Sequence, residues 1–257
     1  MRIHPSGRES ICLYPRHEAP LLGILIVPLI VPCAPAPAVR CGDTMRHAQF
    51  IKANTRLLPV PLVPEVRLHL AEESLAIWRQ TEEELGRMNV PPPWWAFAWA
   101  GGQALTRFLM DHPDWVKGKR VLDFAAGSGL SAIGAAKAGA ALVQAAEIDD
   151  YAIAAIALNA RINDVAIELL REDLVGVDPR WDVVLAGDVC YERPMAERVI
   201  AWFRALAGRG VAILMGDPGR AYLPQSGLVE LARYQVPTSL ELEDRTVRET
   251  IVWRLMP

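Results

Sequence analysis

The chain has 257 residues, 52% of them hydrophobic, so it can bury a large core and form one sizeable domain or two small ones. Its 27 Lys and Arg residues are outnumbered by 30 Asp and Glu residues, for a formal net charge of −3. Surfaces that bind nucleic acid are typically basic, so this balance excludes a nucleic-acid partner from our expectations and favours a protein or small-molecule substrate. The four cysteines have no spacing typical of a disulfide framework or a zinc site. We therefore expect a cytoplasmic, monomeric protein with no bound metal.

Residues 1–44 differ in composition from the rest of the chain. An apolar run from Leu21 to Cys33 follows several arginines and is interrupted by Pro28 and Pro32. The run is too short and too rich in proline to span a membrane, although an export signal is an alternative. We favour a disordered leader, or upstream sequence translated from a start placed too early, with Met45 as the true start.

Residues 45–115 are expected to form an N-terminal arm and a helical cap. Ile51 to Val66 alternates apolar residues with prolines, which indicates an extended arm. Glu65 to Arg87 carries leucines and a tryptophan among acidic residues and predicts a helix, with His69 to Gln80 as the better-patterned part. After a proline break, a string rich in tryptophan precedes a short helix predicted from Ala104 to His112.

In residues 116–257, short apolar runs alternate with helical patterns, which is typical of a doubly wound parallel sheet. The predicted strands are Arg120 to Phe124, Leu142 to Glu147, Ile167 to Leu170, Trp181 to Ala186 and Val211 to Met215. The predicted helices are Leu130 to Gly139, Tyr151 to Asn163 and Pro194 to Ala207. Three segments follow the fifth strand: Gln225 to Ala232, Tyr234 to Val236 and Thr246 to Leu255, the last two able to form an antiparallel pair.

A glycine-containing turn follows the first of these strands. The string Val121 to Gly129 runs from the strand into Gly127 and Gly129, just before a predicted helix. Glycines let the backbone approach a ligand closely, and the N-terminus of the helix offers free N–H groups to a ligand carboxylate. Asp123 precedes the turn in a D-x-A-x-G-x-G arrangement, which resembles the acidic, glycine-rich first motif of methyltransferases, although that motif more often has glycine in place of Ala125. The candidate cofactor-binding residues are therefore Asp123, Ala125, Gly127 and Gly129.

Two acidic residues extend this candidate site. Glu147 lies twenty residues after Gly127, at the end of the second predicted strand, where a carboxylate can accept both ribose hydroxyls of a nucleotide cofactor. The segment Gly127 to Ala132 also satisfies the dinucleotide fingerprint, so the pattern fits nicotinamide-dependent oxidoreductases as well as methyltransferases. Asp173 follows the third strand, where a carboxylate can accept the adenine amino group. An acid on a surface turn is the alternative for Asp173.

Longer strings resemble one known family. They are Trp94 to Gln103, Val121 to Gly129, Gly187 to Glu192 and Gly216 to Arg220. In this order they resemble the lysine methyltransferases of the electron transfer flavoprotein beta subunit, which are seven-β-strand class I S-adenosylmethionine-dependent methyltransferases. The resemblance covers residues 45–257. It implies a Rossmann-like α/β fold: a seven-stranded sheet, mostly parallel with an antiparallel C-terminal strand and with helices on both faces.

The resemblance also implies roles for individual residues. Asp188 and Tyr191 match the D-x-x-Y signature of the group, which implies that they are catalytic and border the pocket where the acceptor nitrogen meets the methyl group. Asp188 and Trp99 are further expected to contact S-adenosylmethionine. A helix cap for Asp188 and ordinary packing for Tyr191 are the structural alternatives.

The implied function is transfer of a methyl group from S-adenosylmethionine to a protein lysine, with the flavoprotein beta subunit as protein partner. The alternatives are a small-molecule N-methyltransferase similar to nicotinamide N-methylases and an NAD(P)-dependent oxidoreductase. An oxidoreductase also needs catalytic residues such as a Tyr/Lys pair or a histidine, and no convincing set is present.

Overall fold

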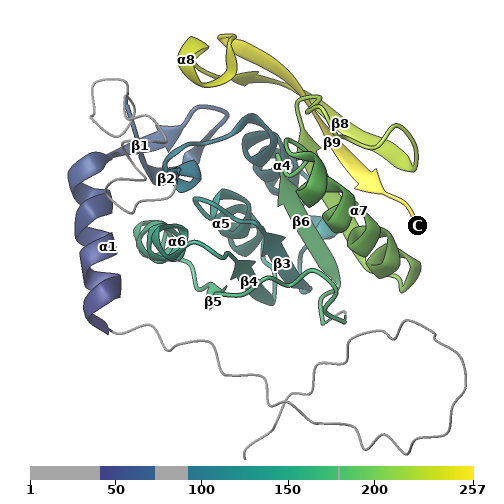
Figure 1. Cartoon of the computed structure of the whole chain (residues 1–257), viewed down its shortest axis with the longest axis horizontal. Coiled ribbons are helices and arrows are strands. Elements are labelled where there is room, and N and C mark those ends of the chain that lie inside the picture. The colour runs from purple at the N-terminus through teal and green to yellow at the C-terminus, as the bar shows by residue number, and fades with distance from the viewer. Residues whose placement is uncertain (1–40, 73–91, 179) are drawn as a thin grey trace, which may run out of the picture. The chain divides into compact units, whose positions relative to one another are not determined.

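A seven-stranded sheet with the strand order β5-β4-β3-β6-β7-β9-β8 forms the centre of the protein (Figure 1). The computed structural model describes residues 41–72, 92–178 and 180–257. The strands are β3 (Arg120–Phe124), β4 (Leu142–Ala146), β5 (Glu168–Leu170), β6 (Val183–Gly187), β7 (Ala212–Asp217), β8 (Leu228–Pro237) and β9 (Val247–Leu255). The sheet belongs to the compact unit Gly42–Pro257.

The direction of the strands confirms the expected topology. β3 pairs in parallel with β4 and β6, and the parallel ladders continue to β5 on one side and β7 on the other. β9 lies between β7 and β8 and is antiparallel to both. The last strand of the chain is therefore inserted into the sheet, and the carboxyl ends of β3, β4, β6 and β7 share one edge.

Helices cover both faces of the sheet, as expected. The helices are α4 (Ala100–Asp111), α5 (Leu130–Lys137), α6 (Asp150–Ile162) and α7 (Arg193–Gly208), with α8 (Leu240–Glu243) and the 3-10 turns η1 (Trp94–Ala96) and η2 (Pro113–Trp115). Residues alternate between the faces of a strand, so Val121 of β3 packs under α4 and α5 while Leu122 packs under α7. Two apolar layers thus enclose the sheet.

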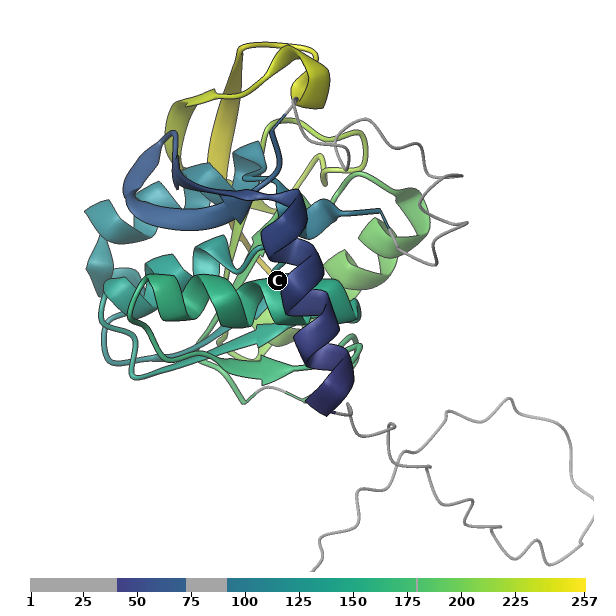
Figure 2. The same ribbon diagram turned by 90° about the vertical axis from the view of Figure 1, so that its left-hand side faces the viewer.

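The N-terminal part adds a helix, α1 (Cys41–Asn54), and a hairpin of β1 (Arg56–Val60) and β2 (Val63–Leu70). Figure 2 shows α1 lying across the helical layer, where Ile51 packs in one cluster with alanines of α6. α1 begins four residues before Met45, and residues 1–40 of the expected leader lie outside the described residues. No helix within the described ranges is both long and apolar enough to cross a membrane.

The expected helix from Glu65 is wrong at its beginning, because β2 extends to Leu70. Val66, Leu68 and Leu70 are buried in alternation, which is the period of a strand. The remainder of that prediction lies mostly in residues 73–91, outside the described residues. The predicted extended arm becomes the hairpin, except that its first residues, from Ile51, belong to α1.

Two asparagines, one in α6 and one at its C-terminal cap, bind the hairpin to α6. Asn159 accepts a hydrogen bond from the backbone N–H of His69 (2.9 Å), and Asn163 accepts one from that of Arg67 (3.1 Å). The side chain of Asn159 also donates to the carbonyl oxygen of Ser128 (2.9 Å). α6 therefore connects the unpaired edge of β2 to the glycine turn that follows β3.

Candidate cofactor and acceptor site

The predicted site residues gather at the carboxyl edge of the sheet. Open α/β sheets bind ligands at this edge, where helix N-termini and strand ends meet. Here the edge is formed by β3, β4, β6 and β7 together with the first turns of α4 and α5. In the described part of the chain, no cluster of three or more His, Cys, Asp or Glu side chains is arranged to hold a metal ion.

The glycine turn has the left-handed backbone that its sequence indicates. Gly127 has φ 52° and Gly129, which caps the N-terminus of α5, has φ 77°. A Cβ on Gly129 would also lie 3.0 Å from Ile156 of α6. Ala125 has φ 51°, so an alanine here adopts a conformation that glycine adopts without strain.

Asp123 is hydrogen-bonded to the first turn of α5, which follows the glycine turn. Its side chain is buried, and Oδ2 accepts a hydrogen bond from the backbone N–H of Ala132 in α5 (2.8 Å). Burial raises the pKa of Asp123 well above its ordinary value, with a smaller contribution from the negative charge of Glu147. Asp123 therefore holds the N-terminus of α5, and its expected contact with the cofactor stays a prediction.

Glu147 lies beside the turn and is held by backbone groups. Oε1 accepts from the N–H of Gly127 (2.7 Å) and Oε2 from the N–H of Ile148 (3.1 Å). Burial raises the pKa of Glu147 above its ordinary value, and no Lys or Arg forms an ion pair with it in the described part of the chain. A carboxylate has about four lone-pair sites, so Glu147 keeps acceptor capacity beyond its backbone contacts. The site therefore fits the two ribose hydroxyls of a nucleoside as donors.

Asp173 lies on the turn after β5 and is half exposed. It accepts from the N–H of Val175 (3.0 Å) and pairs with Arg198 of α7 (2.7 Å). Although partial burial raises its pKa, the ion pair with Arg198 brings the pKa of Asp173 below its ordinary value. These contacts match the surface-turn alternative, and the contact with adenine stays a prediction.

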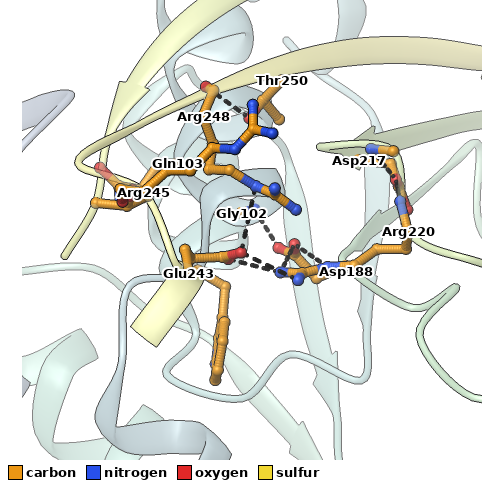
Figure 3. Close-up of polar contacts among 12 residues, drawn as sticks. Gly102, Gln103, Asp188, Asp217, Arg220, Glu243, Arg245, Arg248 and Thr250 are labelled. Atoms are coloured by element: carbon orange, nitrogen blue, oxygen red, sulfur yellow. Dashed lines mark hydrogen bonds and ion pairs between the residues drawn. The ribbon is translucent and has the colours of Figure 1, made fainter. Parts of the chain in front are cut away.

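Asp188 follows β6 directly and is held on both oxygens (Figure 3). Its backbone is left-handed, with φ 58°, which turns the side chain towards α4. Oδ2 accepts from the N–H of Gly102 in the first turn of α4 (3.1 Å), and Oδ1 accepts from Nη2 of Arg220 (2.7 Å). Burial raises the pKa of Asp188 while the Arg220 charge opposes that rise.

Arg220 is shared between two acids from distant segments. Besides Asp188, it makes two hydrogen bonds to Glu243 of α8, Nη2 to Oε1 at 2.7 Å and Nη1 to Oε2 at 3.1 Å. Glu243 also lies 3.5 Å from Nε of Arg248 in β9. The guanidinium is 5.7 Å from the ring centre of Trp99. Arg220 thus joins the end of β6, the turn of the β8–β9 hairpin and the tryptophan string.

Asp217 does not pair with the Arg220 side chain. Its Oδ1 instead accepts from the backbone N–H groups of Gly219 and Arg220, both at 2.7 Å, while the buried Oδ2 has no partner. The sequence alone does not predict the partners of Arg220. In the structure, the side chain of Arg220 pairs with Asp188 and Glu243.

Three aromatic rings lie close together beside the glycine turn, at the carboxyl edge of the sheet. Trp94 and Tyr191 are 48% and 47% exposed, with ring centres 5.9 Å apart. Trp99 is 5.6 Å from Trp94, and its Nε1 donates to the Trp94 carbonyl oxygen (2.9 Å). That carbonyl is the atom nearest to a Cβ built on Gly127. The aromatic mouth, defined as Trp94, Trp99 and Tyr191, therefore adjoins the glycine turn.

Three glycines, Gly101, Gly187 and Gly216, let α4 approach the ends of β6 and β7 closely. A Cβ on Gly101 would lie 2.1 Å from the carbonyl oxygen of Gly216 and 2.6 Å from Oδ2 of Asp188. A Cβ on Gly187 would lie 2.9 Å from the nitrogen of Gly102. Because these positions lack side chains, the first turn of α4 can donate to Asp188.

The sequence missed the partners of Asp188. Arg220 and Gly102 lie in strings that were singled out, but nothing in the sequence indicated that they contact Asp188, and Glu243 lies outside every such string, because only the folded sheet brings these groups together. Trp94 belongs to the tryptophan string, whose composition fits packing over the sheet and stacking on a ligand equally well.

Comparisons with known proteins agree with this geometry. The model of the ribosomal protein L11 methyltransferase family (PrmA) matches residues 106–191. The electron transfer flavoprotein beta subunit lysine methyltransferase of Xenopus laevis is 35% identical over 215 residues, covering 81% of this chain and 86% of that protein. The protein of the same name from Homo sapiens is 30% identical over 239 residues, covering 89% and 90%.

Among solved structures, a ribosomal protein L11 methylase from Lactobacillus delbrueckii subsp. bulgaricus aligns with a TM-score of 0.45 and 20% identity, covering 63% of this chain and 81% of that one. The two curated relatives span most of the chain and of their own length. Their identity decides between the cofactor classes that the glycine turn left open. The chain therefore belongs to the electron transfer flavoprotein beta subunit lysine methyltransferase family, and it is a class I S-adenosylmethionine-dependent methyltransferase.

Proposed function

We propose that this chain methylates a lysine side chain of an electron transfer flavoprotein beta subunit. The observation that carries the proposal is the 35% identity, over 81% of the chain, to a relative named for this activity. When bound, S-adenosylmethionine supplies a methyl group on a positively charged sulfur, which keeps the electron pair of the broken C–S bond while the acceptor nitrogen forms the new N–C bond.

The cofactor half of the site is proposed to comprise the glycine turn and Glu147. The free lone pairs of Glu147 would accept the ribose hydroxyls, while the N-terminus of α5 behind Gly129 would bind the carboxylate of the amino-acid moiety. Asp173 and Trp99 remain proposed contacts of this half. Because Glu147 is fixed by two backbone N–H groups, it is oriented before any ligand arrives.

The acceptor half is proposed to comprise Asp188 and two rings of the aromatic mouth, Trp94 and Tyr191. A lysine amine has a pKa near 10.4 in water, so the site must favour the neutral form for attack. Asp188 would orient the amine through a hydrogen bond. The half-exposed rings of Trp94 and Tyr191 would contact the aliphatic part of the side chain and exclude water. No described cation covers these two rings, whereas Arg220 lies over Trp99.

The experiment that tests the proposal uses the flavoprotein beta subunit of the same organism, produced without this enzyme. The purified chain and labelled S-adenosylmethionine are added, and the product is mapped by mass spectrometry. We expect label on a lysine of the subunit, and loss of that label with Asp188→Asn. Asp150→Asn, which alters the Arg171 ion pair outside the proposed acceptor half, should leave the yield unchanged. Label only on small amines such as nicotinamide would contradict the protein substrate.

The compartment and the oligomeric state are part of the same proposal. A cytoplasmic enzyme is supported by cysteine usage, because Cys190 is the one cysteine in the region of the chain from residue 45 onward. Its thiol is buried, and burial together with neighbouring acids raises its pKa to about 12, so it is poorly suited to oxidation. Light scattering after size exclusion is expected to give the mass of one chain.

A further inference from the structure

Asp188, the proposed partner of the acceptor amine, already has a cationic partner of its own. Nε and Nη2 of Arg220 lie 3.2 and 2.7 Å from its Oδ1, and the side chains of Asp188 and Arg220 are only 11% and 17% exposed. We propose that Arg220 is a positioning residue that balances the charge of Asp188, so that the acceptor amine loses its proton readily, and that Glu243 holds Arg220 in place. This inference rests on the proposed function, which brings an amine to Asp188.

The chemical reason is the effect of a neighbouring charge on an amine. An unpaired carboxylate stabilises an ammonium group and raises its pKa, whereas a nearby cation lowers the pKa. Only the neutral amine has the lone pair that forms the new bond. An isolated Asp188 would therefore attract the lysine but keep it protonated. With Arg220 beside it, Asp188 still accepts a hydrogen bond while its attraction for a positive charge is reduced.

The geometry requires an arginine at this place. Nη2 is 2.7 Å from Oδ1 of Asp188 and 2.7 Å from Oε1 of Glu243, so one planar group joins both acids. Glu243 is 2% exposed and comes from α8, far from Asp188 in the sequence (Figure 3). A lysine offers a compact charge without the planar fork of donors. Lysine at position 220 would therefore not make both sets of contacts.

The surrounding charges are the same in wild type and in the variants that test this balance. Arg248 of β9 also lies beside Oε2 of Glu243, and the N-terminus of α4 adds a partial positive charge at Gly102. Asp217, whose pKa burial raises to about 6, is ionised above that pH, whereas the buried Cys190 thiol stays neutral because its pKa is raised to about 12. The proton of the acceptor ammonium passes to water before methyl transfer, so no side chain in the cluster has to keep it.

The test measures the pH dependence of single-turnover methyl transfer to the flavoprotein beta subunit with saturating S-adenosylmethionine. Glu243→Gln keeps an oxygen that accepts from Arg220 but removes a negative charge, so Arg220 stays in place and the pH at which the amine becomes reactive should fall. Arg220→Met removes the balancing positive charge, so that pH should rise, and the maximal rate should drop at least tenfold. Arg233→Met, which breaks exposed ion pairs in β8, is the matched control and should leave the profile unchanged. A purely structural role would not move the two profiles in opposite directions.

Binding of S-adenosylhomocysteine is measured in parallel and should stay within twofold of wild type in both variants. If Arg220→Met does not fold, Arg220→Gln replaces it, because it also removes the positive charge and should shift the profile in the same direction. Profiles that coincide with wild type, or that move in the same direction, overturn the inference while the proposed function stands. Absence of lysine product from the wild-type enzyme overturns the proposed function itself.

Discussion

The two halves of the site satisfy their buried acids in different ways. In the proposed cofactor half, Asp123 and Glu147 accept hydrogen bonds from backbone N–H groups. Beside the proposed acceptor half, Asp188 and Glu243 share the guanidinium of Arg220. A carboxylate held by amides has no counter-ion and can still accept from neutral hydroxyl donors, whereas the charge of a carboxylate held by a cation is balanced.

The difference suits what each half must bind. A ribose brings hydroxyls that donate hydrogen bonds without carrying charge, so Glu147 needs orientation and no counter-ion. An acceptor amine arrives protonated and must leave its proton behind, so the carboxylate beside it is better paired. The comparison therefore links the type of partner at each acid to the step that the acid serves.

The largest expected effect tests the close approach of the first turn of α4 to the ends of β6 and β7. Gly101→Ala places a Cβ 2.1 Å from the Gly216 carbonyl oxygen, which is backbone and cannot move aside. We expect the free energy of unfolding to fall by more than about 3 kcal/mol, measured by chemical denaturation. Gly102→Ala is the matched control, because its Cβ meets nothing closer than 3.8 Å. Equal stabilities of the two variants would show that the close approach is not required.

The second prediction tests the cofactor half alone. Glu147→Gln removes the charge that strengthens the proposed hydrogen bonds from the ribose. We expect the dissociation constant of S-adenosylhomocysteine to rise about 100-fold, roughly 2.7 kcal/mol, since hydrogen bonds to charged groups contribute about 1.5–3 kcal/mol each. Calorimetric titration measures it, with Asp150→Asn as a neighbouring control on α6. An unchanged constant would remove Glu147 from the cofactor site.

The third prediction uses pH. Burial raises the pKa of Asp217 from an ordinary value of 3.8 to about 6, so the folded state binds this proton more tightly than the unfolded state. Asp217 therefore contributes less to stability as the pH rises from about 4 through 6. We expect Asp217→Asn to be more stable than wild type by about 2 kcal/mol at pH 8 and equal to it near pH 4.

Denaturation curves at both pH values check this prediction. Asp182→Asn is the opposite case, because the exposed ion pair with Arg120 lowers the pKa of Asp182. That variant should lose a small amount of stability above pH 4 and gain none. A stability difference between Asp217→Asn and wild type that is the same at every pH would contradict the account of Asp217.

The smallest expected effect concerns the glycine turn. Ala125 has φ 51°, a backbone conformation that costs an alanine about 1 kcal/mol, while glycine adds flexibility to the unfolded chain. We expect Ala125→Gly to raise the free energy of unfolding by less than about 1 kcal/mol. Ala126→Gly is the control and should destabilise. Thermal unfolding of the two variants decides whether the turn is strained.

The fold could be predicted where the pattern is local. The first predicted strand of the sheet, Arg120 to Phe124, coincides with β3, and the antiparallel pairing at the C-terminus was anticipated. Tyr234 to Val236 and part of Gln225 to Ala232 proved to be one strand, β8, with a bulge between Glu230 and Ala232. Arg233 interrupted the apolar pattern, but on the exposed side of the ladder it pairs with acids of both strands.

The edge of β2 could not be predicted, because the groups that satisfy it are distant in the sequence. Helix and strand patterns compete over Glu65 to Leu70. Pairing with β1 on one edge, and hydrogen bonds to Asn159 of α6 and to Asn163 just after it on the other, decide for the strand. Tertiary contacts of this kind override local periodicity.

The site also has a part that the sequence predicts and a part that it does not. The glycine turn and Glu147 lie within one strand–helix–strand unit, so their spacing in the sequence predicts their proximity. Asp188 was found through its motif, but its partners come from α4, from the loop after β7 and from α8. No spacing rule connects these segments. Side-chain networks between distant elements therefore require the structure.

The most direct test of the two-half account combines one variant from each half with two measurements. Affinity for S-adenosylhomocysteine and the single-turnover rate of lysine methylation are measured for wild type, Glu147→Gln and Arg220→Met. The account predicts that Glu147→Gln loses affinity and that Arg220→Met keeps wild-type affinity while its rate falls and its pH profile moves to higher pH. Loss of affinity in Arg220→Met, or wild-type affinity in Glu147→Gln, would contradict it.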